Sequence, residues 1–223
     1  MSTIFIISLI LLIPIVWLLI RCHQAQRVNW GATWMNYLDG LNRLFCQYYH
    51  RLPPDNFIDL PEKGGAIIVA NHLSGVDGFL LIASSLRPVR FLIAREYYDR
   101  FWAKWLLKRM GCIPVERSTN PEKALRAAYH ALKSGEVIAI FPQATFVLPH
   151  DPPKKLKKGA FWLAQNTQSP IYPVYLSGIT GSGHIIRAIL LRGNTRVKLH
   201  PAISHIDKNT IEKVQILLDG NHQ

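Results

Sequence analysis

Residues 66–77 read AIIVANHLSGVD, an apolar pentapeptide followed directly by a polar cluster. The pentapeptide is uncharged and rich in β-branched residues, which is typical of a strand buried in a parallel sheet. In an open α/β sheet, ligands and reacting groups lie beyond the carboxyl ends of the strands. His72 falls just beyond such an end. We therefore expect residues 66–70 to form a strand that leads into a functional site.

Similar apolar runs recur along the chain and alternate with helical patterns. The runs expected to be strands are 66–70, 89–94, 113–115, 137–141 and 171–176, with 196–199 as a further candidate. The helical patterns cover residues 77–86, 96–110 and 121–133. The last has Asn120 as its expected N-cap and Pro121 at its first position. This alternation predicts an α/β fold with a mixed, largely parallel sheet flanked by helices.

The composition limits the class of protein. The 223 residues suffice for one large domain and an appendage. Hydrophobic residues make up 49% and charged residues 18%, which is too apolar for a disordered protein and indicates contact with lipid. The net charge of +12 attracts partners that carry phosphate, either nucleic acid or an anionic membrane. Three scattered cysteines without a CxxC pair argue against a disulfide framework or a zinc site, and favour a reduced, cytosol-facing body.

The N-terminal segment from Ile4 to Ile20 is uncharged and ends before Arg21. Its length approaches the roughly 20 residues that cross a bilayer core, so we predict a transmembrane or membrane-embedded helix over residues 1–21. A cleaved signal peptide is the alternative, but no basic residue precedes the run and no small-residue cleavage site follows it. Because positive charge flanks only the C-terminal side, we expect the rest of the chain on the cytoplasmic face of the cell membrane, in a single-pass or monotopic protein.

Residues 30–50 carry apolar side chains at helical spacing. These are Trp34, Leu38, Leu41 and Phe45, with three tyrosines alongside. The pattern predicts an amphipathic helix within residues 22–52. Its aromatic side chains suit the headgroup region of a membrane, where a ring with a polar edge is well accommodated. A helix that faces the protein core would show a similar stripe, so both interpretations stay open.

His72 and Asp77 are the candidates for acid–base chemistry. On a continuous helix, positions five apart are rotated by about 140° and do not meet. They can touch only where the segment turns, and the small residues Ser74 and Gly75 permit such a turn. Asp77 would then orient the imidazole, and His72 would act as a base on a hydroxyl brought by the substrate. The alternative is a loop histidine beside an ordinary acid at a helix N-terminus.

Four sequence blocks resemble, in the same order, those of the glycerolipid acyltransferases of the 1-acyl-glycerol-3-phosphate (lysophosphatidic acid) acyltransferase type. They are NHLSGVD (71–77), GCIPVER (111–117), LKKGAFWLAQ (156–165) and SPIYPV (169–174). The first block matches the family pattern NHxxxxD. The resemblance predicts an acyltransferase domain over residues 53–223, after the two N-terminal membrane helices.

The resemblance implies transfer of a fatty acyl chain from acyl-CoA or acyl carrier protein to the free hydroxyl of a lysophospholipid, foremost 1-acyl-glycerol-3-phosphate to give phosphatidic acid. It implies His72 as the base and Asp77 as its partner, and requires no metal, prosthetic group or nucleic acid. The candidate substrate-binding residues are Asn71, Arg117, Gln143, Thr145, Lys157 and Lys158. In this family the arginine of the second block is thought to bind the acceptor phosphate, although Arg117 could instead pair with Glu116 or with an acid of a neighbouring helix.

A lysine cluster overlaps the start of the block LKKGAFWLAQ. It consists of Lys154, Lys155, Lys157 and Lys158. Beside a membrane, such lysines would attract anionic lipid, the phosphates of CoA or the acidic surface of acyl carrier protein. A solvated loop is the alternative. Nucleic acid is a poor explanation of the basic charge, because no helix-turn-helix or aromatic RNA-binding signature is present.

A further block, between GCIPVER and LKKGAFWLAQ, departs from the family pattern FPEGTR, because residues 141–146 read FPQATF. Gln143 removes a charge but keeps a donor and an acceptor. Phe146 removes an arginine fork, which binds phosphate at about 1.5 to 3 kcal/mol for each charged hydrogen bond. Ala144 replaces a glycine, the residue that a positive φ favours. Either Arg117 and the lysines hold the phosphate, or the acceptor differs, for example a lyso-ornithine lipid or a lysophosphodiester; a catalytically silent lipid-binding relative is the remaining alternative.

Overall fold

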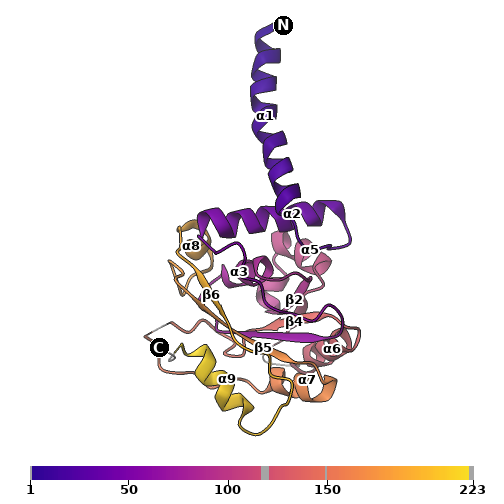
Figure 1. The fold of residues 1–223 in the computed structure, drawn as a ribbon, viewed down its shortest axis with the longest axis vertical. Coiled ribbons are helices and arrows are strands. Elements are labelled where there is room, and N and C mark those ends of the chain that lie inside the picture. Colours follow the sequence, from indigo (N-terminus) through magenta and orange to yellow (C-terminus); the bar gives the residue numbers. More distant parts are fainter. Residues whose placement is uncertain (1, 117–120, 149, 221–223) are drawn as a thin grey trace.

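A central sheet runs through the molecule, and helices cover both of its faces (Figure 1). The computed structural model describes residues 2–116, 121–148 and 150–220, and for residues 2–11 it gives the backbone of a helix. The strands are β1 (Ala66–Ala70), β2 (Val89–Ala94), β3 (Ile113–Val115), β4 (Val137–Ile140), β5 (Ile171–Ser177) and β6 (Arg196–Leu199). Within the described residues, these strands form one sheet in the order β3-β2-β4-β1-β5-β6.

β1 lies inside the sheet, between β4 and β5, and is parallel to both. β2 is parallel to β3 and β4, whereas β6 is antiparallel to β5. The predicted mixed, largely parallel sheet is therefore confirmed. Every residue of β1 is buried, because both faces of an inner parallel strand are covered.

Two hydrophobic cores lie on opposite faces of the sheet. Ile68 of β1 belongs to one core with Leu80 and Ala188, and Ile67 belongs to the other with Ala128 and Leu163. The helices are α1 (Ser2–Ala25), α2 (Thr33–Leu44), the π-helix η1 (Phe45–Tyr49), α3 (Asp77–Ala83), α4 (Arg95–Tyr98), α5 (Phe101–Arg109), α6 (Pro121–Lys133), α7 (Gly159–Thr167), α8 (Ile185–Leu190) and α9 (Thr210–Leu218). Thus α3 and α8 cover one face of the sheet, and α6 and α7 cover the other.

Some predicted helices differ from those in the structure. The helix expected over 77–86 ends at Ala83, and the one expected over 96–110 is divided into α4 and α5. The division falls at Arg100, whose backbone is extended with φ −61° and ψ 127°. The prediction for α6 agrees with the structure, although its expected cap Asn120 lies outside the described residues.

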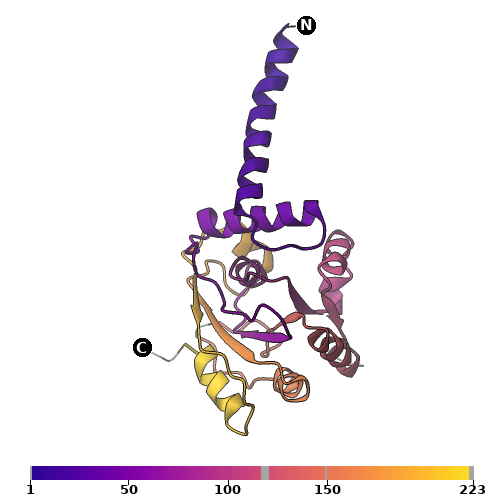
Figure 2. The same ribbon diagram turned by 45° about the vertical axis from the view of Figure 1, so that its right-hand side comes forward.

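The two N-terminal helices form a T-shaped pair. α1 stands away from the sheet, and α2 lies across its base, as both views show (Figure 1, Figure 2). They cross closely at Gly40, where a Cβ atom would lie 1.9 Å from the carbonyl oxygen of Cys22. Among the helices of the described ranges, none is both long enough and apolar enough to pass through a membrane. The transmembrane helix predicted over residues 1–21 is therefore unsupported.

α2 turns part of its predicted apolar stripe away from the core. Leu38 and Leu41 are 39% and 42% exposed, whereas Asp39 and Arg43 are buried. The alternative of a stripe that faces the protein core is wrong for these two leucines. The reason is that the inner face of α2 is occupied by an ion pair.

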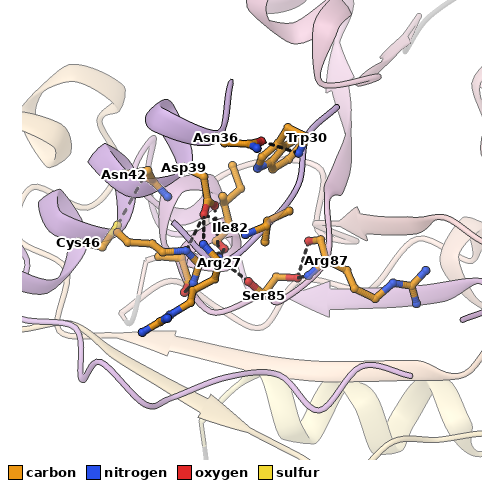
Figure 3. Close-up of polar contacts among 12 residues, drawn as sticks. Arg27, Trp30, Asn36, Asp39, Asn42, Cys46, Ile82, Ser85 and Arg87 are labelled. Carbon is orange, nitrogen blue, oxygen red and sulfur yellow. Dashed lines mark hydrogen bonds and ion pairs between the residues drawn. The ribbon is translucent and has the colours of Figure 1, made fainter. Parts of the chain in front are cut away.

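Arg43 is the centre of a buried polar cluster with Asp39 and Ser85. Figure 3 shows Asp39 on α2 close to Ile82 and Ser85. Arg43 Nε lies 2.9 Å from Oδ2 of Asp39. Its other nitrogens donate to the carbonyl oxygens of Ala83, at 2.7 Å, and Ser85, at 2.6 Å. Asp39 also accepts the backbone N–H of Arg27 at 2.9 Å. A buried ion pair is stable only when its remaining polar atoms are bonded, and here those bonds fasten α2 to the C-terminal end of α3.

Candidate active site

His72 and Asp77 meet at the carboxyl end of β1. The imidazole Nδ1 lies 2.7 Å from Oδ2 of Asp77. The carboxylate is fully buried, whereas the imidazole side chain is 23% exposed. Because Asp77 occupies Nδ1, Nε2 is the ring nitrogen left for a substrate. The predicted contact is present, and it can support general-base chemistry.

The turn between these two residues is built by hydrogen bonds to Asp77. Its Oδ2 accepts the backbone N–H groups of Leu73 at 2.7 Å and Ser74 at 2.9 Å, and its Oδ1 accepts the Ser74 hydroxyl at 2.9 Å. Gly75 serves another purpose, since a Cβ atom there would lie 2.7 Å from the Cα of Ile185. Ser74 therefore shapes the turn, and Gly75 permits the close approach of α8.

The segment 141–147, which follows β4, holds the backbone of His72 on two sides. The buried Gln143 accepts the His72 N–H at its Oε1, at 3.0 Å. The N–H of Val147 donates to the His72 carbonyl oxygen at 2.8 Å. These contacts favour a positioning role for Gln143, rather than the substrate contact predicted for it.

Two aromatic rings flank the imidazole of His72. Phe141 stacks on it with a centroid distance of 4.1 Å and an angle of 14°. Phe146 meets it edge-on at 4.5 Å and 66°. A cavity of about 330 Å³ opens beside Phe146, with Asp151 and Lys154 in its lining. The sequence signals Phe146 only as the loss of an arginine, and nothing in the sequence indicates its contact with His72.

Ala144 confirms that the turn in this segment has a positive φ. Its φ is 59°, in the left-handed region that glycine occupies without strain. Its N–H donates to the carbonyl oxygen of Phe141 at 3.0 Å, which closes the turn. Residue 144 therefore has the left-handed backbone conformation that favours glycine, although it is an alanine.

Asn71 connects β1 to β5. Its Nδ2 donates to the carbonyl oxygen of Leu176 at 2.9 Å, and its Oδ1 accepts the Leu176 N–H at 2.7 Å. The side chain is buried between the strands. This arrangement favours a positioning role over the predicted substrate contact.

Three further predicted substrate residues lie near the same end of the sheet. Thr145 is exposed within the segment that holds His72. Lys157 and Lys158 are exposed directly before α7. The N–H of Lys157 donates to the carbonyl oxygen of Pro142 at 2.9 Å, so the lysines lie next to this segment. Their contact with a substrate stays a prediction.

Arg117, the predicted phosphate ligand of the second block, lies outside the described residues. Its neighbour Glu116 is described and forms an ion pair with Arg95, with 2.9 Å between Oε1 and Nε. Arg95 directly follows β2, so this ion pair joins the ends of β2 and β3.

Comparisons with known proteins agree with this geometry. Residues 55–177 match the Acyltransferase family, and this range includes β1 to β5 and the His72–Asp77 pair. The chain is similar to 1-acyl-sn-glycerol-3-phosphate acyltransferase of Bacillus subtilis, with 28% identity over 54% of this chain and 59% of that protein. It is also similar to a probable 1-acyl-sn-glycerol-3-phosphate acyltransferase of Mycoplasma genitalium, with 30% identity over 63% of this chain and 51% of that protein.

The match thus spans between half and three fifths of the length of these two curated relatives. The fold is similar to the crystal structure of the 1-acyl-sn-glycerophosphate (LPA) acyltransferase PlsC from Thermotoga maritima, with a TM-score of 0.62 and 18% identity over 85% of this chain and 81% of that chain. At this identity the likeness concerns the fold alone. Because the family match covers more than half of the 223 residues and includes the His72–Asp77 pair, the chain belongs to the Acyltransferase family.

Proposed function

We propose that the protein is an O-acyltransferase that moves a fatty acyl chain from an acyl thioester, acyl-CoA or acyl carrier protein, to the free hydroxyl of a lysophospholipid. The observation that carries this proposal is the 2.7 Å contact of His72 Nδ1 with a buried Asp77, on an imidazole that is partly exposed. The names of the curated relatives favour 1-acyl-sn-glycerol-3-phosphate as the acceptor, which would give phosphatidic acid.

In the proposed reaction, His72 acts on the acceptor hydroxyl. Nε2 takes the hydroxyl proton while the oxygen attacks the carbonyl carbon of the thioester. The carbon–sulfur bond then breaks, and the imidazolium returns the proton to the departing thiolate. Asp77 holds the ring in the required tautomer and stabilises the imidazolium. Direct transfer of this kind needs no covalent enzyme intermediate, metal or prosthetic group.

We place this reaction at the cytoplasmic face of a membrane, with the protein held monotopically. Residues 12–20 of α1 carry exposed apolar side chains, and Leu38 and Leu41 of α2 are exposed as well. The exposed lysines before α7 would attract anionic lipid or the phosphates of CoA. The three cysteines are buried and unpaired, which is consistent with a reducing compartment.

An acceptor panel tests the proposed function. Purified protein in detergent is offered labelled acyl-CoA or acyl carrier protein, together with lysophosphatidic acid, a lysophosphodiester or a lyso-aminolipid. A labelled diacyl product would establish acyl transfer and identify the acceptor. If lysolipid binds but is never acylated, the catalytically silent alternative holds and the proposal is wrong.

The first prediction concerns the two residues of the dyad. His72→Ala is expected to lower kcat by roughly 10² to 10⁴, the usual loss for a general base, and Asp77→Asn should follow it closely because the tautomer is no longer held. His130→Ala, at an exposed position of α6, is the matched control and should leave kcat unchanged. Comparable turnover by a folded His72→Ala protein would exclude the direct-base mechanism.

A second candidate acceptor is favoured by the position of Phe146. Its ring lies against His72, where the family pattern has an arginine, so this wall of the site is apolar rather than cationic. The missing arginine weakens binding of a phosphate monoester more than binding of a lysophosphodiester or a lyso-aminolipid, which need fewer cationic contacts. The candidate function is acyl transfer to one of these acceptors.

The second prediction follows from the presence of Phe146 where the family pattern has arginine. Phe146→Arg combined with Ala144→Gly should lower the KM for lysophosphatidic acid, with a smaller effect on kcat. An arginine that binds the acceptor phosphate lies far from the reacting carbon, so it stabilises the ground state and the transition state about equally. Trp162→Arg on α7 adds the same charge away from this segment and serves as the control. The unchanged protein could already have a low KM for lysophosphatidic acid and lose its use of this acceptor in Arg117→Ala. That result would show that Arg117 suffices and that Phe146 is neutral.

A further inference from the structure

The outer face of α5 carries strongly exposed aromatic side chains. Phe101 is 92% exposed, Trp102 65% and Trp105 61%. On a helix these positions lie within about 100° of one another, so they form a single face. Large aromatic side chains gathered in this way on a protein surface indicate an interaction site.

The folding of α5 does not account for this face. The opposite side of the helix carries the buried Ala103, and Leu107 and Met110 pack against the core below it. The contacts that hold α5 on the protein are therefore made without Phe101 and Trp102. The rings of Phe101 and Trp102 are left for a partner outside the chain.

The charges around this face are positive. Arg100, Lys104, Lys108 and Arg109 are all exposed, and the sequence from 100 to 110 contains no acidic residue. The acid that precedes this stretch in the sequence, Asp99, lies 2.9 Å from Lys104 and is paired with it. Aromatic rings interleaved with basic residues suit the headgroup region of an anionic bilayer. A second copy of the same face is disfavoured, because it would bring like charges together.

This face also adjoins the N-terminal helices. Trp105 stacks on Trp34 of α2 at 4.8 Å and 19°, and the guanidinium of Arg109 lies 5.9 Å from the centroid of the Trp34 ring. α5 lies close to α2 at the end of the molecule from which α1 emerges, whereas α7 and α9 lie at the opposite end (Figure 1). A membrane that receives α1 would therefore lie near α5.

We propose that the outer face of α5 is a second membrane contact, with Phe101 and Trp102 inserted between the headgroups of an anionic bilayer. This inference rests on the membrane location in the proposed function and goes beyond it, because it assigns a contact outside α1 and α2. The basic residues of α5 then lie at the level of the lipid phosphates. Contact through both α1 and α5 would restrict the tilt of the protein on the membrane.

A site-specific label tests this contact in the full chain. Phe101→Cys carries a fluorophore, and Trp162→Cys on α7, an exposed site far from α5, carries it in the control. The native cysteines are buried, so labelling is directed to the new site. The proteins are bound to phosphatidylcholine vesicles that contain phosphatidylglycerol and nitroxide-labelled lipid. We expect the label at position 101 to be quenched roughly threefold more strongly than the label at 162. Equal quenching at both sites would overturn the proposal.

A double substitution measures the strength of the contact. Phe101→Ser with Trp102→Ser should weaken binding to these vesicles about tenfold, whereas Trp162→Ser with Ile216→Ser, two exposed apolar residues of α7 and α9, should leave binding unchanged. An equal loss in both proteins would contradict a role for α5. An unquenched label at position 101, together with a dimer in sedimentation that the first variant abolishes, would assign the face to a second copy instead.

Acyl transfer to a detergent-dispersed acceptor separates this inference from the proposed function. If transfer proceeds but the label at position 101 is not quenched, the α5 contact is wrong and the proposed function stands. If the label is quenched but no acceptor is acylated, the membrane contact stands and the proposed function is wrong.

Discussion

Residues of the segment 141–147 contact both the backbone and the ring of His72. Gln143 binds its N–H, Phe141 stacks on its ring, and Ala144 provides the turn that brings these groups together. Gln143 stands where the family pattern has glutamate, and its Oε1 still provides the acceptor that the His72 backbone uses. The departure from the family pattern at this position therefore preserves the backbone contact while it removes a negative charge beside His72.

The third prediction is that Ala144→Gly stabilises the protein. At φ 59° the alanine Cβ crowds the backbone, at a cost of about 1 kcal/mol that glycine avoids. The free energy of unfolding, measured in urea, should rise by up to about that amount. Ala127→Gly at an exposed position of α6 is the control, and it should instead lose about 1 kcal/mol because glycine is a poor helix former. A comparable loss in both variants would mean that Ala144 is unstrained.

Helix α2 connects the N-terminal region to the candidate active site at the level of whole elements. Its Gly40 contacts α1, and its Arg43 binds the carbonyl groups at the C-terminal end of α3. The other end of α3 begins with Asp77. The short helix that carries the Asp77 carboxylate is thus held at both ends, by Arg43 at one and by His72 and Ser74 at the other.

The fourth prediction tests the crossing of α1 and α2. Gly40→Ala should destabilise the protein by about 1 to 3 kcal/mol, because the new Cβ would lie 1.9 Å from the carbonyl oxygen of Cys22 and the helices must separate. Gly78→Ala in α3 is the control, since its Cβ would meet nothing closer than Phe91 at 3.8 Å. That change should be neutral or stabilising by up to about 1 kcal/mol. Equal behaviour of the two variants in thermal unfolding would contradict a tight crossing.

The whole molecule has two unlike ends. α1, α2 and α5 lie toward one end, and α7 and α9 toward the other (Figure 1, Figure 2). Each helix of the first group exposes at least two large apolar side chains, whereas α7 and α9 expose one each, Trp162 and Ile216. With a net charge of +12, the protein also has a long-range attraction to anionic surfaces. Apolar contact and charge are therefore expected to act together in membrane binding.

The fifth prediction separates the two contributions by salt. At low salt, vesicles with phosphatidylglycerol should bind the full chain at least about tenfold more tightly than pure phosphatidylcholine vesicles, because each lysine or arginine near the surface contributes about 1 kcal/mol. Raising the salt to about 1 M shortens the screening length to about 3 Å and should remove this preference, while binding to the neutral vesicles persists. A preference that survives high salt, measured by vesicle sedimentation, would point to a specific lipid site instead.

β1 and β4 were predictable because each is a short apolar run, rich in β-branched residues, that is buried on both faces. β1, β2, β3 and β6 have the predicted bounds, and β4 and β5 differ from them by one residue. The helices were less predictable, because α4 and α5 share a continuous helical pattern that only the extended backbone at Arg100 interrupts. The orientation of α2 was not predictable either. Its apolar stripe is compatible with a core-facing helix, but the buried Asp39–Arg43 ion pair faces the core instead and leaves Leu38 and Leu41 exposed.

The sequence by itself determined the class of fold and the contact between His72 and Asp77, because both depend on local patterns: strand burial, and a turn within six residues. Only the tertiary structure decided what surrounds that contact. Phe146 lies against His72 across a separation of 74 residues, and Arg43 reaches the end of α3 from a different helix. Such contacts depend on which strands are neighbours in the sheet and which helices cross, and no local pattern carries that information.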